Sequence, residues 1–231
     1  ILNGQKIYCT NGSWADIAIT FAKVNGKYTA FILDKECEGW NLGGEEDKMG
    51  IKGSSTATFF FENCKVPVEN VLKGAGKGFA IAMNALDNSR IGIAAQALGI
   101  AQGAYEAALK YAHEREAFGK PIAHHQMITT YLADMATRID AARLLVYKAS
   151  WAKEEHYENG GPRHTKEASM AKLYAGDTAM WVSERAVQVL GGYGYTKEFP
   201  VERFFRDAKI TQIYEGTQEV QRIVIARAIK P

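Results

Sequence analysis

The spacing of apolar residues changes once along this chain, near residue 75, and this change limits the folds that the chain can adopt. Before it, short apolar or alternating runs are bounded by turn residues, a pattern typical of strands. From Gly78 onward, small and branched apolar residues recur every three or four positions, which predicts helices. We therefore predict an α+β chain with an antiparallel β-sheet domain over residues 1–73 and a helical domain over residues 74–231.

In the β-like part, Asn3-Gly4 and Asn25-Gly26 each lie between apolar or alternating runs and mark tight turns, because Asn-Gly supplies the two positive φ angles of a type I′ hairpin turn. The dipeptide Asn25-Gly26 predicts a hairpin between strands over residues 17–24 and 27–33. A further strand is expected over residues 56–61, before Val66-Pro67. Together these segments predict a small antiparallel sheet.

The other dipeptide, Asn3-Gly4, predicts a hairpin whose first strand is very short. Only Ile1 and Leu2 precede the turn, whereas the strand that follows covers residues 5–10. Since a hairpin needs two strands of comparable length, we expect this chain to be the C-terminal part of a longer polypeptide.

Four helices are predicted in the second part, and they suit an antiparallel four-helix bundle in which each helix buries one stripe against its neighbours. The second ends at Asn159-Gly160-Gly161-Pro162, through which no helix continues, and the third ends at Gly191-Gly192. The predicted helices cover residues 78–114, about 124–157, about 165–190, and from near Gly216 to the C-terminus.

Charge and composition argue against several classes of partner. The 28 basic and 26 acidic residues give a net charge of +2 without blocks of like charge, so neither nucleic acid nor a membrane is expected as a partner. The longest stretch of low charge, residues 78–112, contains Asp87 and Arg90, which a membrane-spanning helix tolerates poorly. No metal site is expected, because His124 and His125 are adjacent and lack regularly spaced companions. Three cysteines, an odd number in a chain of this size, favour a reducing compartment.

The segment before the last predicted helix contains a candidate catalytic base. Glu215 lies between apolar neighbours, Ile213 and Tyr214, and the residue Gly216, which would let a substrate approach the backbone closely. Reduced solvation in such surroundings would make the carboxylate a stronger base. The alternative interpretation is that Glu215 only complements the helix dipole and that Thr217 caps the helix.

Two loops are candidate binding segments. In Gln188–Tyr195, glycines that follow a helix could admit an extended ligand or hold phosphate on backbone N–H groups, or could simply end the helix. In Arg115–Gln126, Arg115 could pair with a diphosphate and Phe118 could stack on a planar ring. Alternatively, Arg115 is a solvated cation at a helix end and Phe118 fills the core.

Asp87 and Arg90 are three residues apart on an otherwise apolar helix. Two charges buried together usually pair with each other. The functional alternative is that they face a cleft and bind a polar ligand.

Taken together, the order of the motifs resembles that of the acyl-CoA dehydrogenase family over essentially the whole chain, and it is most similar to the short-chain, butyryl-CoA dehydrogenase branch. The resemblance implies that residues 1–73 are the second half of a middle β domain and that residues 74–231 are a C-terminal four-helix bundle. The matching segments are Asp47–Thr56, Arg90–Ala101, Arg115–Gln126, Gln188–Tyr195 and Arg206–Thr217.

The resemblance implies an FAD-dependent α,β-dehydrogenation of an acyl-CoA thioester, with electrons passed to an electron-transfer flavoprotein. It also implies a homotetramer built as a dimer of dimers, located in the bacterial cytoplasm or the mitochondrial matrix, with the cytoplasm favoured. By resemblance, Glu215 is the base that removes the α-proton, and its backbone N–H helps to polarise the thioester carbonyl. Other branches carry the base at the position of Ser89, which cannot act as one.

The resemblance also implies binding residues, although Tyr8 stands where the family often has Trp. Acyl-CoA contacts are expected at Asp87, Arg90 and Gly216. Flavin contacts are expected at Tyr8, Cys9, Thr10, Arg115, Phe118, Gln126, Gln188, Gly191, Gly192, Thr217 and Glu219, with Arg115, Phe118 and Gln126 acting across a subunit interface.

Three other functions remain open at the level of sequence. A relative with the same fold could act on a branched, cyclic or aromatic acyl-CoA. An acyl-CoA oxidase-like enzyme would reoxidise its flavin with oxygen. A non-catalytic bundle could bind flavin without turning over acyl-CoA, although the presence of Glu215 and the absence of a basic stripe argue against it.

Overall fold

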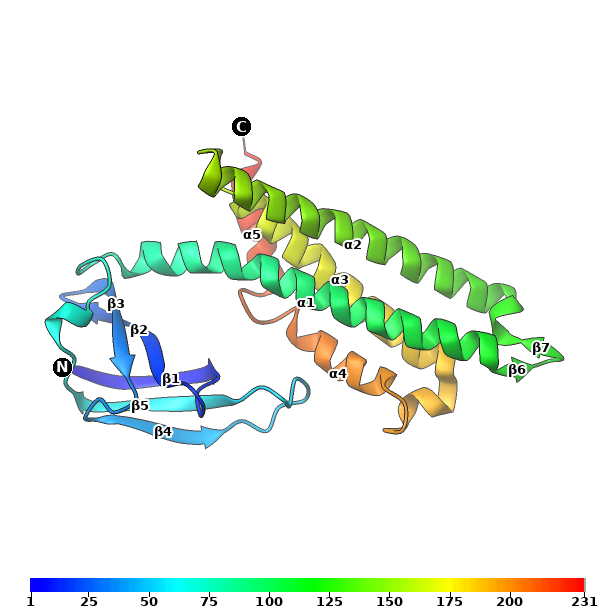
Figure 1. Cartoon of the computed structure of the whole chain (residues 1–231), viewed down its shortest axis with the longest axis horizontal. Helices are drawn as coiled ribbons and strands as arrows, with labels where there is room; N and C mark the ends of the chain where they lie inside the picture. The colour runs from blue at the N-terminus through cyan, green and yellow to red at the C-terminus, as the bar shows by residue number, and fades with distance from the viewer. Residues whose placement is uncertain (231) are drawn as a thin grey trace. The chain divides into compact units, whose positions relative to one another are not determined.

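In a computed structural model, which describes residues 1–230, the chain divides into two compact units (Figure 1). Residues 1–85 form the sheet unit, and the chain from Leu86 onward forms the helical unit. The change of pattern near residue 75 lies just before helix α1 (Gly78–Glu114), whereas the two units divide within that helix. No helix of the described chain is both long enough and apolar enough to cross a membrane.

All strand pairs of the sheet unit are antiparallel. One sheet has the strand order β1-β5-β4, and the other is the hairpin β2-β3. The bounds are β1 Leu2–Thr10, β2 Ile17–Val24, β3 Lys27–Asp34, β4 Trp40–Glu45 and β5 Thr56–Cys64, followed by a short 3-10 helix, η1, at Val68–Asn70.

The dipeptides Asn3-Gly4 and Asn25-Gly26 have different structures. Asn25 and Gly26 have φ angles of 48° and 78°, so the hairpin predicted between β2 and β3 is confirmed. The hairpin predicted at Asn3-Gly4 is wrong, because both residues lie inside β1. Gly4 has a φ of 138° where the pairing of β1 with β5 shifts register, so its conformational freedom serves a β-bulge. The argument for a missing strand partner therefore fails, since β1 pairs with β5.

The core of the sheet unit is apolar. On β5, Ala57, Phe59 and Phe61 alternate with more exposed residues and point into the core, as the period of two requires. They pack with Leu33 of β3, and the ring of Trp40 contacts Phe59 edge-on, with ring centroids 4.9 Å apart. The burial of these side chains is what holds the two sheets together.

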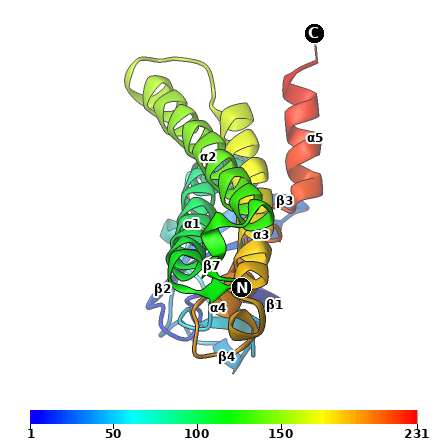
Figure 2. The same cartoon turned by 90° about the vertical axis from the view of Figure 1, so that its right-hand side faces the viewer.

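The helical unit contains three long helices and two short ones (Figure 2). The predicted ends of α1 and α3 are confirmed. Helix α4 was not predicted. After α3 the structure therefore has two short helices, where the sequence analysis predicted one. The bounds are α1 Gly78–Glu114, α2 Gln126–Glu158, α3 Thr165–Leu190, α4 Val201–Ile210 and α5 Gln218–Ala228, with short strands β6 Glu116–Ala117 and β7 Lys120–Pro121 and 3-10 helices η2 Ile122–His124 and η3 Gly191–Tyr195.

Alanine dominates the interior of the helical unit. Ala94, Ala97, Ala101 and Ala104 of α1 are fully buried at helical spacing, and α3 buries a similar series. Such small residues let helices approach closely, as at Gly103, where an added Cβ would lie 3.0 Å from the Phe204 ring of α4. The same interior also buries polar side chains, namely Asp87, Arg90, His164, Ser169, Lys172, Thr178, Ser183, Thr211, Gln218 and Gln221.

Candidate active site

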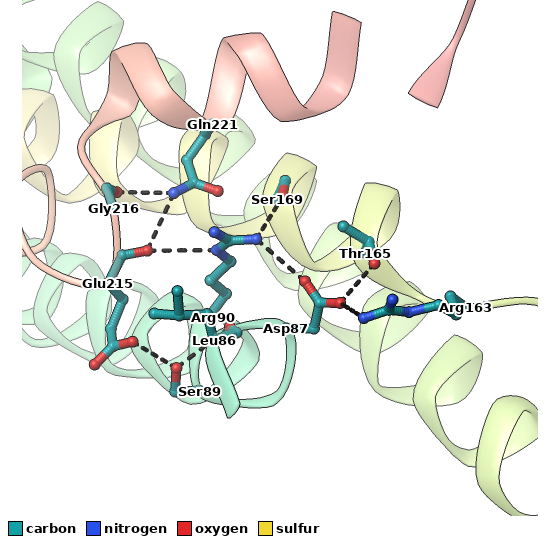
Figure 3. Close-up of polar contacts among 10 residues, drawn as sticks. All are labelled: Leu86, Asp87, Ser89, Arg90, Arg163, Thr165, Ser169, Glu215, Gly216 and Gln221. Carbon is teal, nitrogen blue, oxygen red and sulfur yellow. Dashed lines mark hydrogen bonds and ion pairs between the residues drawn. The ribbon is translucent and has the colours of Figure 1, made fainter. Parts of the chain in front are cut away.

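Glu215 lies in the turn between α4 and α5, and its backbone has an unusual conformation. Its φ is 54° and that of Gly216 is 88°, so two successive residues occupy the left-handed region. For a residue other than glycine this costs on the order of 1–3 kcal/mol, and it persists only when the surroundings hold it. The half-buried carboxylate accepts a hydrogen bond of 2.6 Å from Ser89 Oγ of α1 (Figure 3).

Side chains from three helices hold the carbonyl groups of this turn. Gln221 Nε2 of α5 donates to the carbonyls of Glu215 (3.2 Å) and Gly216 (2.8 Å). Arg90 Nε of α1 is 3.4 Å from the Glu215 carbonyl oxygen, and Lys172 Nζ of α3 is 2.8 Å from that of Gly216. The φ of 88° favours glycine at position 216, and a Cβ there would lie 2.8 Å from Gln221 Nε2 and displace that amide.

Asp87 and Arg90 form the buried pair that one of the two interpretations of the sequence expected, and Arg90 also contacts the Glu215 turn. They pair with each other, with 3.2 Å between Arg90 Nη1 and Asp87 Oδ1, and both side chains are only 5% exposed. Asp87 Oδ2 also accepts from Arg163 Nη2 (2.7 Å) and Thr165 Oγ1 (2.6 Å), as Figure 3 shows. Arg90 thereby reaches the Glu215 turn with its charge balanced inside the helical unit.

Burial changes the titration of three side chains around the turn. Burial, and then the nearby charge of Arg90, lower the pKa of Lys172 to about 8. Burial also lowers the pKa of Arg90, although Asp87 opposes this. The pKa of Tyr214 is raised to about 12 because its hydroxyl, which donates to Gln96, is partly buried.

Lys172 and Ser89 are contacts of the turn that the sequence analysis did not identify. Lys172 is fully buried on the stripe of α3 that includes Ala168, Ala175 and Ala179. A single lysine on such an alanine-rich face is a signal that could have revealed it. Nothing in the local pattern indicates that Ser89 donates to Glu215, because the two residues are 126 positions apart.

The glycine-rich loop borders an open groove. Arg115, Gly191 and Gly192 line it with Tyr111 and others, and its volume is about 440 Å³. The N–H of Gly191 caps α3, as the structural interpretation of this loop expects. No atom lies within 4 Å of an added Cβ at Gly191 or Gly192, so the groove faces bare backbone. The exposed Gln188 lies one turn earlier on α3.

Phe118 lies at the turn of the β6-β7 hairpin. Its side chain is 96% exposed, so the alternative that it fills the core is wrong. His125 contacts its ring edge-on, with centroids 5.9 Å apart, and the exposed Gln126 begins α2 beside it. The Phe118 ring therefore lies outside the core of the helical unit.

The remaining predicted residues lie in two other grooves. Thr217 caps α5, and its hydroxyl is the main cause of the lowered pKa of Glu219. Both line a polar groove of about 310 Å³. In the sheet unit, Tyr8, Cys9 and Thr10 line a groove of about 410 Å³, where the side chain of Tyr8 is 67% exposed. Partial burial raises the pKa of the Cys9 thiol.

Comparison with known proteins agrees with the expected family. The middle domain of acyl-CoA dehydrogenases matches residues 1–64, and the C-terminal domain matches residues 76–230. A short-chain-specific acyl-CoA dehydrogenase of Megasphaera elsdenii is 52% identical over 99% of this chain and 60% of its own length.

Solved structures agree as well. The butyryl-CoA dehydrogenase structure from M. elsdenii has a TM-score of 0.93 at 51% identity, and the match covers 98% of this chain and 59% of that one. A chain from a study of the electron transferring flavoprotein of Acidaminococcus fermentans has a TM-score of 0.95 at 52% identity, covering 99% of this chain and 60% of that one. The chain thus spans about three fifths of the length of these relatives, and it belongs to the acyl-CoA dehydrogenase family.

Proposed function

We propose that the protein containing this chain is an FAD-dependent dehydrogenase that converts a short-chain acyl-CoA into the trans-2-enoyl-CoA, with Glu215 as the base that removes the α-proton. The observation that carries the proposal is the placement of Glu215. Its carboxylate is half-buried on a left-handed turn, Ser89 orients one oxygen, and side chains from three helices hold the turn.

The free groups of Glu215 suit this chemistry. Oε2 accepts from Ser89, whereas Oε1 has no hydrogen-bond partner among the described residues and can accept a proton from carbon (Figure 3). The backbone N–H of Glu215 donates to no residue of the described chain either. It is available to polarise the thioester carbonyl, which acidifies the α-proton.

The described residues fit a bound FAD. Two glycines without atoms near their Cβ positions leave backbone open to a diphosphate, and Arg115 borders the same groove. Tyr8 and Phe118 expose aromatic rings that can pack on a planar ring system. The bound flavin supplies the acceptor for the hydride that leaves the β-carbon. We propose that the other residues that hold it are Cys9, Thr10, Gln126, Gln188, Thr217 and Glu219.

For the acyl-CoA, we propose that Gly216 lets the thioester approach the backbone. Asp87 and Arg90 were expected to contact the substrate too. Their side chains are 5% exposed and paired, so their burial favours an indirect role in which Arg90 holds the turn that carries Glu215.

We further propose that the electrons pass to an electron-transfer flavoprotein and that the protein is a homotetramer built as a dimer of dimers. The similarity to a chain from the A. fermentans flavoprotein study supports the first proposal. The exposed Phe118 and Gln126 support the second, because a neighbouring subunit would give them a partner. Three free cysteines favour a reducing compartment, the bacterial cytoplasm or the mitochondrial matrix.

Anaerobic addition of butyryl-CoA to the flavin-loaded, full-length protein tests the proposal. We expect loss of the oxidised flavin absorbance, and its recovery when an electron-transfer flavoprotein is added. Faster bleaching by a branched, cyclic or aromatic acyl-CoA would reassign the substrate, and rapid recovery with oxygen alone would indicate an oxidase. If no acyl-CoA bleaches the flavin, the dehydrogenase proposal fails.

A further inference from the structure

Lys172 is a buried cation whose contacts are unusual. Its side chain is fully buried in the middle of α3. Nζ donates to the carbonyl of Gly216 at 2.8 Å and lies 3.4 Å from Oε1 of Gln218. Among the described residues no carboxylate forms an ion pair with it. The partners of this ammonium group are therefore neutral oxygens.

Such an arrangement does not favour stability. Moving an ammonium group out of water is unfavourable, and a well-placed ion of opposite charge is needed to offset the loss of hydration. Here the burial lowers the pKa of Lys172 to about 8, with Arg90 adding to the effect and Asp177, Glu215 and Glu219 opposing it. An apolar side chain of similar length would fill the same space without this cost, so the amine is better explained by what it holds.

The amine holds the residue next to Glu215. The carbonyl of Gly216 receives two donors at 2.8 Å, Lys172 Nζ and Gln221 Nε2. Because the peptide is planar, fixing this oxygen fixes the orientation of the whole unit between Gly216 and Thr217. Gly216 adopts its left-handed φ freely, but that of Glu215 needs such restraints, since without them this residue would relax to a more common conformation.

We propose that Lys172 is a positioning residue for Glu215. Through the Gly216 carbonyl it keeps the turn in the left-handed conformation that places the Glu215 carboxylate beside Ser89 and toward the α-proton. This inference rests on the proposed function of Glu215, and it adds a role for a side chain that touches neither substrate nor flavin.

The test is Lys172→Met in the flavin-loaded, full-length protein, with Lys110→Met, an exposed residue of α1, as the control. We expect kcat for butyryl-CoA to fall about 10- to 100-fold, the loss typical of a misplaced catalytic group, while KM and flavin content stay close to wild type. We expect Tm to stay the same or rise, because a buried charge is removed. A purely structural lysine would lower Tm and leave the kcat of the folded fraction unchanged, and that result would overturn the proposal.

A second measurement needs no variant. In the wild type, the rate of flavin reduction should fall as the pH rises through about 8, because Lys172 then loses the charge that holds the carbonyl. A rate that is flat from pH 7 to about 9.5 would overturn the proposal even if the variant did not fold. Glu215→Gln separates the two inferences. If Glu215→Gln is active, Glu215 is not the base and the proposed function of this residue fails. If Glu215→Gln is inactive but Lys172→Met is fully active, only the role of Lys172 fails.

Discussion

The two units of this chain build their interiors in opposite ways. The sheet unit buries an apolar cluster around Leu33, Phe59 and Phe61, and its ion pairs lie on the surface. The helical unit buries Asp87, Arg90 and Lys172 among alanines. A protein gains little stability from buried charges, so their concentration next to Glu215 indicates that this interior is shaped by chemistry as well as by packing.

The two interiors also differ in which substitutions they should tolerate. In the sheet unit, stability comes mainly from the burial of apolar surface, so another apolar side chain of similar volume would be tolerated. In the helical unit, the buried charges depend on partners at hydrogen-bonding distance, as Asp87 has in Arg90, Arg163 and Thr165. A change at one partner therefore leaves another group unsatisfied.

The largest effect on stability is expected from Asp87→Ala. The variant leaves the buried Arg90 guanidinium without its carboxylate, which should cost about 3–5 kcal/mol in the free energy of unfolding. Urea denaturation measures this loss. The control is Asp16→Ala, which removes an exposed ion pair with Lys35 and should change the free energy of unfolding little. If Asp87→Ala and Asp16→Ala lowered the free energy of unfolding by similar amounts, the buried charges of the helical unit would not differ from surface charges as we infer.

A somewhat smaller effect is expected from Leu33→Ala in the sheet unit. This fully buried side chain would leave a cavity, at a cost of about 2–5 kcal/mol. Leu33→Met keeps most of the side-chain volume and leaves no buried charge unpaired. Its free energy of unfolding should therefore be close to that of the wild type. A Leu33→Met variant as unstable as Leu33→Ala in urea would show that the sheet core is more specific than we infer.

The dependence of stability on pH should have opposite signs in the two units. Burial, and then the thiol of Cys37, raise the pKa of Cys64 from its ordinary value of 9.0 to about 11, so the sheet unit should lose stability between these pH values. Burial lowers the pKa of Lys172 from 10.5 to about 8, so the helical unit should gain stability over that interval, where only the unfolded chain still binds the proton.

Tryptophan fluorescence separates the two responses. Trp14 and Trp40 report on the sheet unit, and Trp151 and Trp181 report on the helical unit. Replacing one pair by phenylalanine leaves the fluorescence of the other pair as the signal of its unit. Cys64→Ala and Lys172→Met should abolish the respective slopes. Parallel slopes in both units would contradict the assignment of these groups.

Much of the fold was predictable because its elements are long and regular. The helices over residues 78–114 and 165–190 follow a sustained period, and the hairpin at Asn25-Gly26 depends on local turn chemistry. Strand β4 contains Gly43-Gly44 and forms only because β5 lies beside it. Helix α4 has only ten residues, too few for a clear period. The hairpin predicted at Asn3-Gly4 was wrong because a glycine with positive φ can serve a β-bulge as well as a turn, and here Gly4 serves a bulge.

The candidate site was only partly predictable. Glu215 and Gly216 are recognisable from neighbouring residues, and Asp87 and Arg90 from their spacing on one helix. The contacts that hold the turn come from far away in sequence: Lys172 is 44 residues before Gly216. Such contacts arise only when the helices pack, so a local pattern does not contain them.

The central claim is that Glu215 is the base, and one variant tests it most directly. Glu215→Gln keeps the size and hydrogen-bonding capacity of the side chain but removes the base. In the flavin-loaded, full-length protein it should bind flavin as the wild type does, while the rate of flavin reduction by butyryl-CoA, followed by stopped-flow absorbance, falls by about 10⁴-fold. Reduction of Glu215→Gln at a rate close to that of the wild type would contradict the account.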